Sequence, residues 1–400
     1  MSPSKGPWVL ALLALSTLVN YLDRQSLAVV VPLLRDQIGL TASAYGTISA
    51  AFLIAYGCGQ LVAGPIVDRL GIRLGLSLFV AVWSLAAMLH GFAQSALHLL
   101  LLRILLGCSE AGNWPAGVKA IALWFPVGRR AFYLGIFDGG AAIGAMLAFP
   151  LMAGLSKVYG WRAAFLAVGA LGLIWLILWL LVADDEQAPS RDEKREVLPG
   201  PSLLANSVLW SLMASRFFAT PVWWFYIFWL PDYLSRGRGL SLEQIGLWGW
   251  LPYITVDLGK WIGGHYSDRL AVSPLGFIAA RKRVMTVGAL LMAGAAFVSG
   301  ANSAPAAIAW VCVGTFGFGL WSVNILALHA DSFPSTQLAS AVGFTTASSA
   351  LGGALFTWLT GRIVDAYGYT AAFTLTALLA VTAFLILQLT LASRRQAITS

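Results

Sequence analysis

Apolar runs of about 20 residues follow one another along nearly the whole chain, separated by short polar breaks. A helix of about 20 residues crosses a hydrocarbon core roughly 30 Å thick. The runs lack the period-two alternation that is typical of membrane strands. The 400 residues are 59% hydrophobic and 10% charged, whereas soluble domains carry about 25% charged residues. The sequence therefore predicts an all-α membrane protein.

We place twelve transmembrane helices along the chain. The expected spans are 8–34, 43–66, 73–93, 96–123, 131–156, 161–182, 206–234, 241–267, 283–301, 305–330, 337–360 and 369–391. The first run is too long for a signal peptide and has no small-residue cleavage site before the next span. We therefore expect it to stay as a membrane helix.

The net charge of +8 does not indicate a nucleic-acid partner, because the basic residues are scattered along the chain. Those expected on the cytoplasmic side are Lys5, Arg69, Arg73, Arg129, Arg130, Arg191, Lys194, Arg195, Arg269, Arg281, Lys282, Arg283, Arg394 and Arg395. Those expected outside are Arg35, Lys157, Arg162, Arg236, Arg238 and Arg362. An excess of basic residues in inner loops predicts that both termini are cytoplasmic.

The longest polar break inside the chain predicts two halves. It separates an N-terminal six-helix bundle, 1–182, from a C-terminal six-helix bundle, 206–400, through a cytoplasmic linker, 183–205. Residues 208 positions apart also match: Phe125 with Phe333, Gly135 with Gly343, Gly144 with Gly352, and Tyr159-Gly160 with Tyr367-Gly368. A second match joins Gly64, Asp68 and Arg69 to Gly264, Asp268 and Arg269. One six-helix unit has been used twice, as in transporters built from parallel repeats.

Four charged residues fall deep inside expected membrane helices. They are Asp23 and Arg24 in the first span, and Arg103 and Glu110 in the fourth. A charge near the bilayer centre costs about 2.5–3.5 kcal/mol on the gentlest scale, so it indicates a functional site by default. Arg103 and Glu110 are two helical turns apart, about 10 Å along one face. Two arginines at this depth favour an anionic ligand, because their planar forks bind carboxylates in two places.

Two readings of these charges stay open. The four residues could form a permanent salt-bridge network that only holds helices together. Alternatively, Asp23 and Glu110 release the arginines to a substrate carboxylate and take up a proton, which couples proton entry to substrate entry. A sodium site is a further alternative, although it would need several oxygen ligands.

Several sequence strings resemble one family. The loop GPIVDRLGIR at 64–73 is similar to a signature of the major facilitators, which implies gating roles for Asp68, Arg69 and Arg73. The strings NYLDRQSLAVVVP, RILLGCSEAGNWPAG and PVWWFYIFWLPDYL together resemble the anion:cation symporters of that superfamily, in particular the hexuronate and galactonate transporters. The likeness extends over nearly the whole chain.

The resemblance implies roles for individual residues. Tyr21, Arg24, Tyr56 and Arg103 would contact the sugar acid. Asp23 and Glu110 would carry protons. Two further polar residues are expected at the site: Thr346, which the repeat sets opposite Asp138, and Asn324.

Asp138 stands where the family pattern leads us to expect an uncharged polar residue. It is either a further proton site or specificity change, or an ion-pair partner of Arg24 or Arg103. The roles of Arg216 and Lys260 also stay open. Each could bind the ligand, or could instead snorkel at a helix end or pair with Asp257. We expect Lys119, near the inner end of the fourth span, to snorkel.

The sequence predicts a secondary transporter, not an enzyme, because no nucleophile elbow, phosphate loop or zinc motif is present. We expect proton-coupled symport of a small organic anion, a hexuronate or aldonate, by alternating access. The alternatives are another small mono- or dicarboxylate, sodium coupling, or a non-transporting membrane receptor. We expect a monomer in the bacterial inner membrane, without cofactor or metal. The residues identify neither the anion nor the proton stoichiometry.

Overall fold

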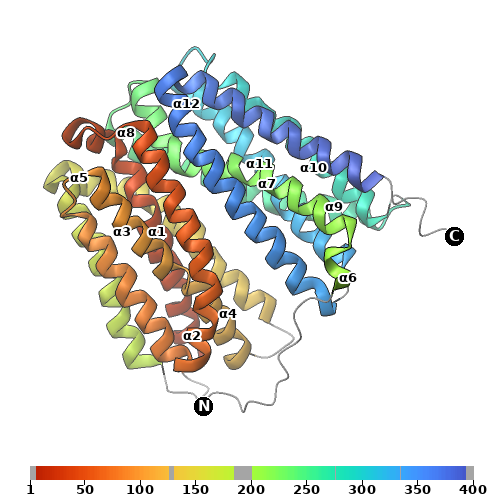
Figure 1. The fold of residues 1–400 in the computed structure, drawn as a ribbon, viewed down its shortest axis with the longest axis horizontal. Coiled ribbons are helices and arrows are strands. Elements are labelled where there is room, and N and C mark those ends of the chain that lie inside the picture. Colours follow the sequence, from red (N-terminus) through yellow and green to blue (C-terminus); the bar gives the residue numbers. More distant parts are fainter. Residues whose placement is uncertain (1–5, 126–129, 184–200, 275, 334, 393–400) are drawn as a thin grey trace. The chain divides into compact units, whose positions relative to one another are not determined.

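The computed structural model describes residues 6–125, 130–183, 201–274, 276–333 and 335–392. These residues form helices joined by short turns and contain no strand (Figure 1). The all-α prediction is therefore confirmed. The elements are α1 (Gly6–Ile38), α2 (Ala42–His90), α3 (Ala96–Glu110), α4 (Asn113–Trp124), α5 (Arg130–Val182), α6 (Pro201–Leu204), α7 (Ser207–Asp232), the π-helix η2 (Tyr233–Gly237), α8 (Leu242–Trp248), α9 (Leu251–Ala271), α10 (Phe277–Ala293), the 3-10 helix η3 (Gly294–Phe297), α11 (Ala304–Ser332) and α12 (Ser335–Ala392).

Three of these helices are each interrupted by one glycine. Gly71 in α2, Gly160 in α5 and Gly368 in α12 have φ values of 77°, 82° and 74°, in the left-handed region that glycine adopts without a Cβ penalty. Each lies in a loop expected between two spans. An unbroken helix of 53 residues, the length of α5, would be about 80 Å long at 1.5 Å per residue. That exceeds twice the thickness of a hydrocarbon core, so each interrupted helix is long enough for the two crossings that the sequence predicts.

Among the described residues, five helical segments have the length and apolar composition needed to cross a membrane. They are Gly6–Ile38, Ala42–His90, Phe132–Val182, Ala304–His329 and Ala341–Thr390. The other expected spans fall on helices that are shorter, interrupted or less apolar. One span covers α3 and α4, one covers α7, one covers α8 and α9, and one covers α10.

The chain forms two compact units. The first comprises Met1–Asp192 and Phe228–Trp250, and the second Glu193–Ile227 and Leu251–Ser400. Residues 228–250, which follow the expected linker by more than 20 positions, thus belong by their contacts to the first unit. Most of that linker lies outside the described residues, as do Lys5, Arg129, Arg191, Lys194, Arg195, Arg394 and Arg395.

The repeat predicted from the sequence is visible inside each unit. In the first unit α1 packs along α5, and a Cβ added to Gly144 would come within 2.1 Å of the Leu18 carbonyl oxygen. In the second unit a Cβ added to Gly352, the equivalent residue of α12, would come within 2.1 Å of the Phe217 carbonyl oxygen in α7. Glycine at both positions allows two helices to approach until their backbones touch.

One end of the first unit carries a network of ion pairs. Arg35 at the end of α1 binds Asp232 at the end of α7, with 2.6 Å between Nη2 and Oδ2, and the two side chains are 6% and 0% exposed. Arg236 lies near both Asp36 and Asp232. The Tyr45 hydroxyl donates to the Phe228 carbonyl oxygen at 2.8 Å. These contacts hold the segment 228–250 in the first unit, at the end that the sequence predicts to be outside.

Candidate functional site

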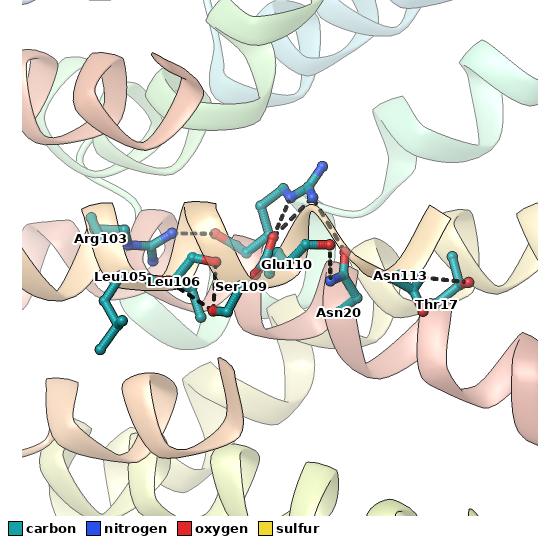
Figure 2. A network of polar contacts seen from close by, with 9 residues as sticks. Thr17, Asn20, Arg103, Leu105, Leu106, Ser109, Glu110 and Asn113 are labelled. Carbon is teal, nitrogen blue, oxygen red and sulfur yellow. Dashed lines mark hydrogen bonds and ion pairs between the residues drawn. The ribbon is translucent and has the colours of Figure 1, made fainter. Parts of the chain in front are cut away.

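The four charged residues expected in the membrane are all buried in the first unit. Asp23, Arg24 and Arg103 are each 2% exposed, and Glu110 is 0% exposed. α1 supplies the first two, and α3 supplies the others. The helices α1 and α3 bring these charges into one polar network, of which Figure 2 shows Arg103, Glu110 and Asn20.

Arg24 and Glu110 form the ion pair at the centre of this network. Arg24 donates to Glu110 Oε2 from Nε at 2.9 Å and from Nη2 at 2.8 Å. Nη2 also donates to Asn20 Oδ1 at 3.2 Å, one helical turn earlier on α1. Asn20 in turn donates to the backbone carbonyl of Glu110 at 3.5 Å. The guanidinium is thereby held in one orientation by groups on two helices.

Aromatic rings surround the Arg24 guanidinium. Its Cζ lies 4.5 Å from the centroid of Tyr21 and 4.6 Å from that of Tyr56. Phe52 on α2 lies 5.3 Å from Arg24 and 5.6 Å from Arg103, so one ring contacts both cations. Cation–π contacts of this kind strengthen when they are desolvated. The structure thus brings together all six residues expected on α1, α2 and α3, and adds Phe52, which sequence reasoning missed because a phenylalanine in an apolar run carries no signal.

Several hydrogen-bonding atoms of the buried charged residues have no partner among the described residues. Arg103 uses Nη1 to donate to the Arg24 carbonyl oxygen at 3.1 Å. Its Nε and Nη2 are buried without a hydrogen-bond partner among the described residues, as are both carboxylate oxygens of Asp23 and Oε1 of Glu110. Asp23 and Arg103 act on each other electrostatically. Buried polar groups normally have partners, so these are the atoms at which a further polar ligand would bind.

A break in the helix directly after Glu110 shapes the site. α3 ends at Glu110 and α4 begins at Asn113, where the sequence predicted one continuous span. The cause is Pro115, which lacks an N–H and whose ring would clash with the carbonyl of Ala111, four residues earlier. A Cβ at Gly112, within the break, would come 2.1 Å from the Phe79 ring. Ala111 and Gly112 keep right-handed helical backbone angles, so the expected fourth span continues through this interruption as α3 followed by α4.

The start of α4 extends the polar network towards α1. Asn113 donates from Nδ2 to Thr17 Oγ1 at 3.0 Å (Figure 2). It also accepts from Ser16 Oγ at 2.8 Å. All three side chains are buried. Sequence reasoning missed Asn113, although its position three residues after Glu110 was a usable signal.

The two site residues expected in the second half lie in the second unit. Asn324 is 0% exposed and donates from Nδ2 to the carbonyl oxygens of Leu320 at 2.8 Å and Gly263 at 3.4 Å. Thr346 is exposed and accepts from Arg216 Nη1 at 3.3 Å. Lys260 pairs with Asp257 at 2.8 Å, which was one of the alternatives open for it.

The expected gating residues lie at the opposite end of the first unit from Arg35. Asp68 pairs with Lys119 of α4 at 2.7 Å. Arg73 donates to the Leu180 carbonyl oxygen of α5 at 3.0 Å, and Arg69 is exposed. Lys119 was expected to snorkel, but it also donates to the Val67 carbonyl at 3.3 Å and so ties α4 to the end of this segment of α2.

Asp138 on α5 is exposed and acts electrostatically on Tyr21. The described ion pair of Arg24 is with Glu110. The described hydrogen bond of Arg103 is to a backbone carbonyl. The choice between the two readings of Asp138 stays open on these contacts.

These features define a helical, multi-pass membrane protein whose buried site gathers two arginines and two carboxylates between transmembrane helices. The chain belongs to the Major Facilitator Superfamily, because residues 13–356 match the sequence model of that family. Members of this superfamily are membrane transporters, and the chain is accordingly a transporter and not an enzyme.

Similar proteins narrow the family further. The chain is 31% identical to the hexuronate transporter of Escherichia coli strain K12 over 385 residues, which cover 92% of this chain and 89% of that protein. It is 32% identical to the galacturonate transporter of Dickeya chrysanthemi over 306 residues, 72% of this chain and 89% of that protein. The expected resemblance to sugar-acid transporters is confirmed. A crystal structure of a bacterial homologue of the human lysosomal transporter Spinster shares the fold, with a TM-score of 0.80, 20% identity and coverage of 98% of this chain and 96% of that one.

Proposed function

We propose that this transporter carries a sugar acid, a hexuronate or an aldonate, by symport with protons. The observation that carries the proposal is the arrangement of Arg24 and Arg103. Arg24 is bound by a carboxylate that a substrate carboxylate could replace, and Arg103 keeps two buried donors without an acceptor in the part of the chain that the structure describes. The relatives named above are transporters of hexuronate and galacturonate, which fits a site of this charge.

The tyrosines beside Arg24 suit a sugar-acid ligand. The ring centroids of Tyr21 and Tyr56 lie 4.5 and 4.6 Å from Arg24 Cζ. A tyrosine contributes both an apolar face for a sugar ring and a hydroxyl for its hydroxyl groups. A substrate carboxylate would bind the two arginines, and its polyol chain would bind the surrounding tyrosines.

The carboxylates supply the coupling. When a substrate carboxylate displaces Glu110 from Arg24, Glu110 is left buried without its cation, and a buried carboxylate without a partner takes up a proton. Asp23, with both oxygens buried and unpartnered among the described residues, is the second proton carrier. Loss of the substrate reverses both steps.

Alternating access requires that the two six-helix halves move about this site. We propose that 1–182 and 206–400 are these halves, that Asp68, Arg69 and Arg73 gate the inner side, and that the protein works as a monomer in the bacterial inner membrane with both termini in the cytoplasm. Such a cycle admits the anion and the proton from one side and releases both on the other.

A binding experiment tests the proposal. A ligand that binds only the folded protein raises its melting temperature by mass action. We expect galacturonate, glucuronate or galactonate to stabilise the detergent-solubilised protein, and the neutral sugar galactose to leave it unchanged. Two results would contradict a site for sugar acids: galactose stabilises the protein as much as the acids do, or none of the acids stabilises it.

A further inference from the structure

Asp138 on α5 is an acidic residue inside a membrane-spanning segment. It lies eight residues after Arg130, where α5 begins, which is about 12 Å along the helix at 1.5 Å per residue. Its side chain is exposed. A carboxylate at this depth is costly in contact with lipid, and such residues face the interior of the bundle or a water-filled cavity. Asp138 therefore faces water or protein rather than lipid.

The helix surface beside Asp138 leaves room for a ligand. Gly135 and Gly139 lie on the same face of α5 as Asp138, because residues three and four apart are neighbours on a helix. A Cβ added to either glycine would meet no atom of the described residues within 4 Å. A Cβ added to Gly140 would instead come 2.2 Å from the Ala14 carbonyl oxygen. Helix α5 is thus held against α1 by one face and presents Asp138 on a more open one.

Asp138 acts on the arginine site through Tyr21. Its electrostatic effect on the Tyr21 hydroxyl is larger than that of Glu110, although Glu110 binds the guanidinium that lies 4.5 Å from the Tyr21 ring. Tyr21 and Tyr56 are both half-buried, whereas the Arg24 side chain that they contact is 2% exposed. All five residues belong to the first unit. The two tyrosines and Asp138 therefore border the accessible side of the Arg24 site.

Asp138 changes the charge that this site can accept. Arg24 and Arg103 carry two positive charges. In the proposed cycle, protons neutralise Asp23 and Glu110 when the substrate binds. Of these five residues, Asp138 then carries the remaining negative charge, and the balance of one positive charge is neutralised by one carboxylate of a ligand. A second ligand carboxylate would be repelled by Asp138, and this repulsion is stronger in a site of low dielectric constant than in water.

We propose that Asp138 restricts this transporter to sugar acids with a single carboxylate. Hexuronates or aldonates are accepted, and aldarates, which have a carboxylate at each end of the chain, are rejected. Repulsion of a closely related ligand is one of the two ways in which a binding site becomes specific. The inference rests on the proposed function, because it uses the anion bound by Arg24 and Arg103 and the protons on Asp23 and Glu110. It gives Asp138 a role in selectivity and none in proton transfer.

Paired ligands test this selectivity by titration calorimetry on the purified full chain. Galactonate and galactarate share one open carbon chain and differ at its end, where galactonate has a hydroxyl and galactarate a second carboxylate. The reference is galactonate or galacturonate, whichever the wild type binds more tightly. We expect the wild type to bind the reference at least about tenfold more tightly than galactarate, because like charges in a binding site are strongly unfavourable. Asp138→Asn should raise the galactarate affinity by about tenfold or more and bring the two affinities within about threefold.

Matched variants separate the charge of Asp138 from other effects. Asp138→Glu keeps the charge and should retain the wild-type selectivity. Asp36→Asn removes the same charge from an exposed position on α1 in the same unit, and should leave both affinities unchanged. Accumulation of the reference acid in proteoliposomes, driven by a pH gradient, should persist in Asp138→Asn. Melting temperatures show that each variant is folded, and the selectivity of the wild type remains a test if Asp138→Asn does not fold.

Several results would overturn the inference alone. The wild type could bind galactarate as tightly as the reference, or Asp138→Asn could leave the ratio of the two affinities unchanged. Equal weakening of both acids in Asp138→Asn would make Asp138 an acceptor for substrate hydroxyls. Loss of accumulation with both affinities unchanged would make it a proton carrier. Binding of neither galacturonate nor galactonate by the wild type would contradict the proposed function together with this inference.

Discussion

Glu110→Gln separates proton coupling from substrate binding in this site. The change keeps an amide oxygen where Glu110 Oε2 accepts from Arg24 at 2.8 and 2.9 Å, but it removes the negative charge and the titratable group. A hydrogen bond to a charged acceptor contributes about 1.5–3 kcal/mol and a neutral one about 0.5–1.5 kcal/mol. We therefore expect the internal partner of Arg24 to weaken by about 1–2 kcal/mol.

The weaker internal partner has two consequences. Because a substrate carboxylate then competes with a neutral amide, galacturonate should bind with unchanged or up to about tenfold higher affinity. The glutamine side chain can neither bind nor release the proton that Glu110 carries. The empty transporter therefore cannot return across the membrane in the deprotonated state that the coupled cycle requires. Exchange of internal for external substrate should persist, whereas accumulation driven by a pH gradient should be lost.

The assay uses proteoliposomes loaded with unlabelled galacturonate for exchange, and empty ones with an imposed gradient for accumulation. Each proton carried with the anion contributes about 1.36 kcal/mol per pH unit, so the wild type should accumulate the anion at least about tenfold for each pH unit. Accumulation of that size in Glu110→Gln would refute the role of Glu110. Loss of folding, exchange and accumulation together would instead favour a permanent structural ion pair, because removal of one partner of a buried pair costs about 3–5 kcal/mol.

The remaining predictions concern other charges. Arg103→Lys should weaken galacturonate binding by about tenfold or more in calorimetry, because lysine lacks the fork; normal binding would limit Arg103 to charge balance. Asp232→Ala leaves Arg35, which is 6% exposed, without its carboxylate, and should lower the unfolding free energy by about 3–5 kcal/mol in a melting experiment; an unchanged melting temperature would contradict a desolvated pair. Asp68→Asn should change stability by no more than about 1 kcal/mol, because its pair with Lys119 is exposed, but should slow uptake; uptake at the wild-type rate would remove this pair from gating.

The sequence was sufficient to predict the fold class and the burial of the four site charges. Apolar length and the scarcity of charge define membrane helices with little help from tertiary contacts. The left-handed residues Gly71, Gly160 and Gly368 fall within loops that hydropathy placed independently. Such features depend on the local chain alone.

Partner choice inside the site was beyond the sequence. Spacing places Arg103 and Glu110 on one face of one helix, but the partner of Glu110 is Arg24 on α1. That choice depends on the rotation of α1 against α3 and on the helix break before Pro115. The pair of Lys119 with Asp68 depends similarly on how α4 packs against α2. Helical periodicity gives the face of a single helix and leaves the axial rotation of its neighbours undetermined.

The most direct measurement of the central claim is uptake of labelled galacturonate into proteoliposomes with and without an inwardly directed proton gradient. The account predicts at least about tenfold accumulation for each pH unit, no accumulation without a gradient, and no uptake by Arg24→Ala. Accumulation that follows a sodium gradient and ignores pH, or normal uptake by Arg24→Ala, would contradict it.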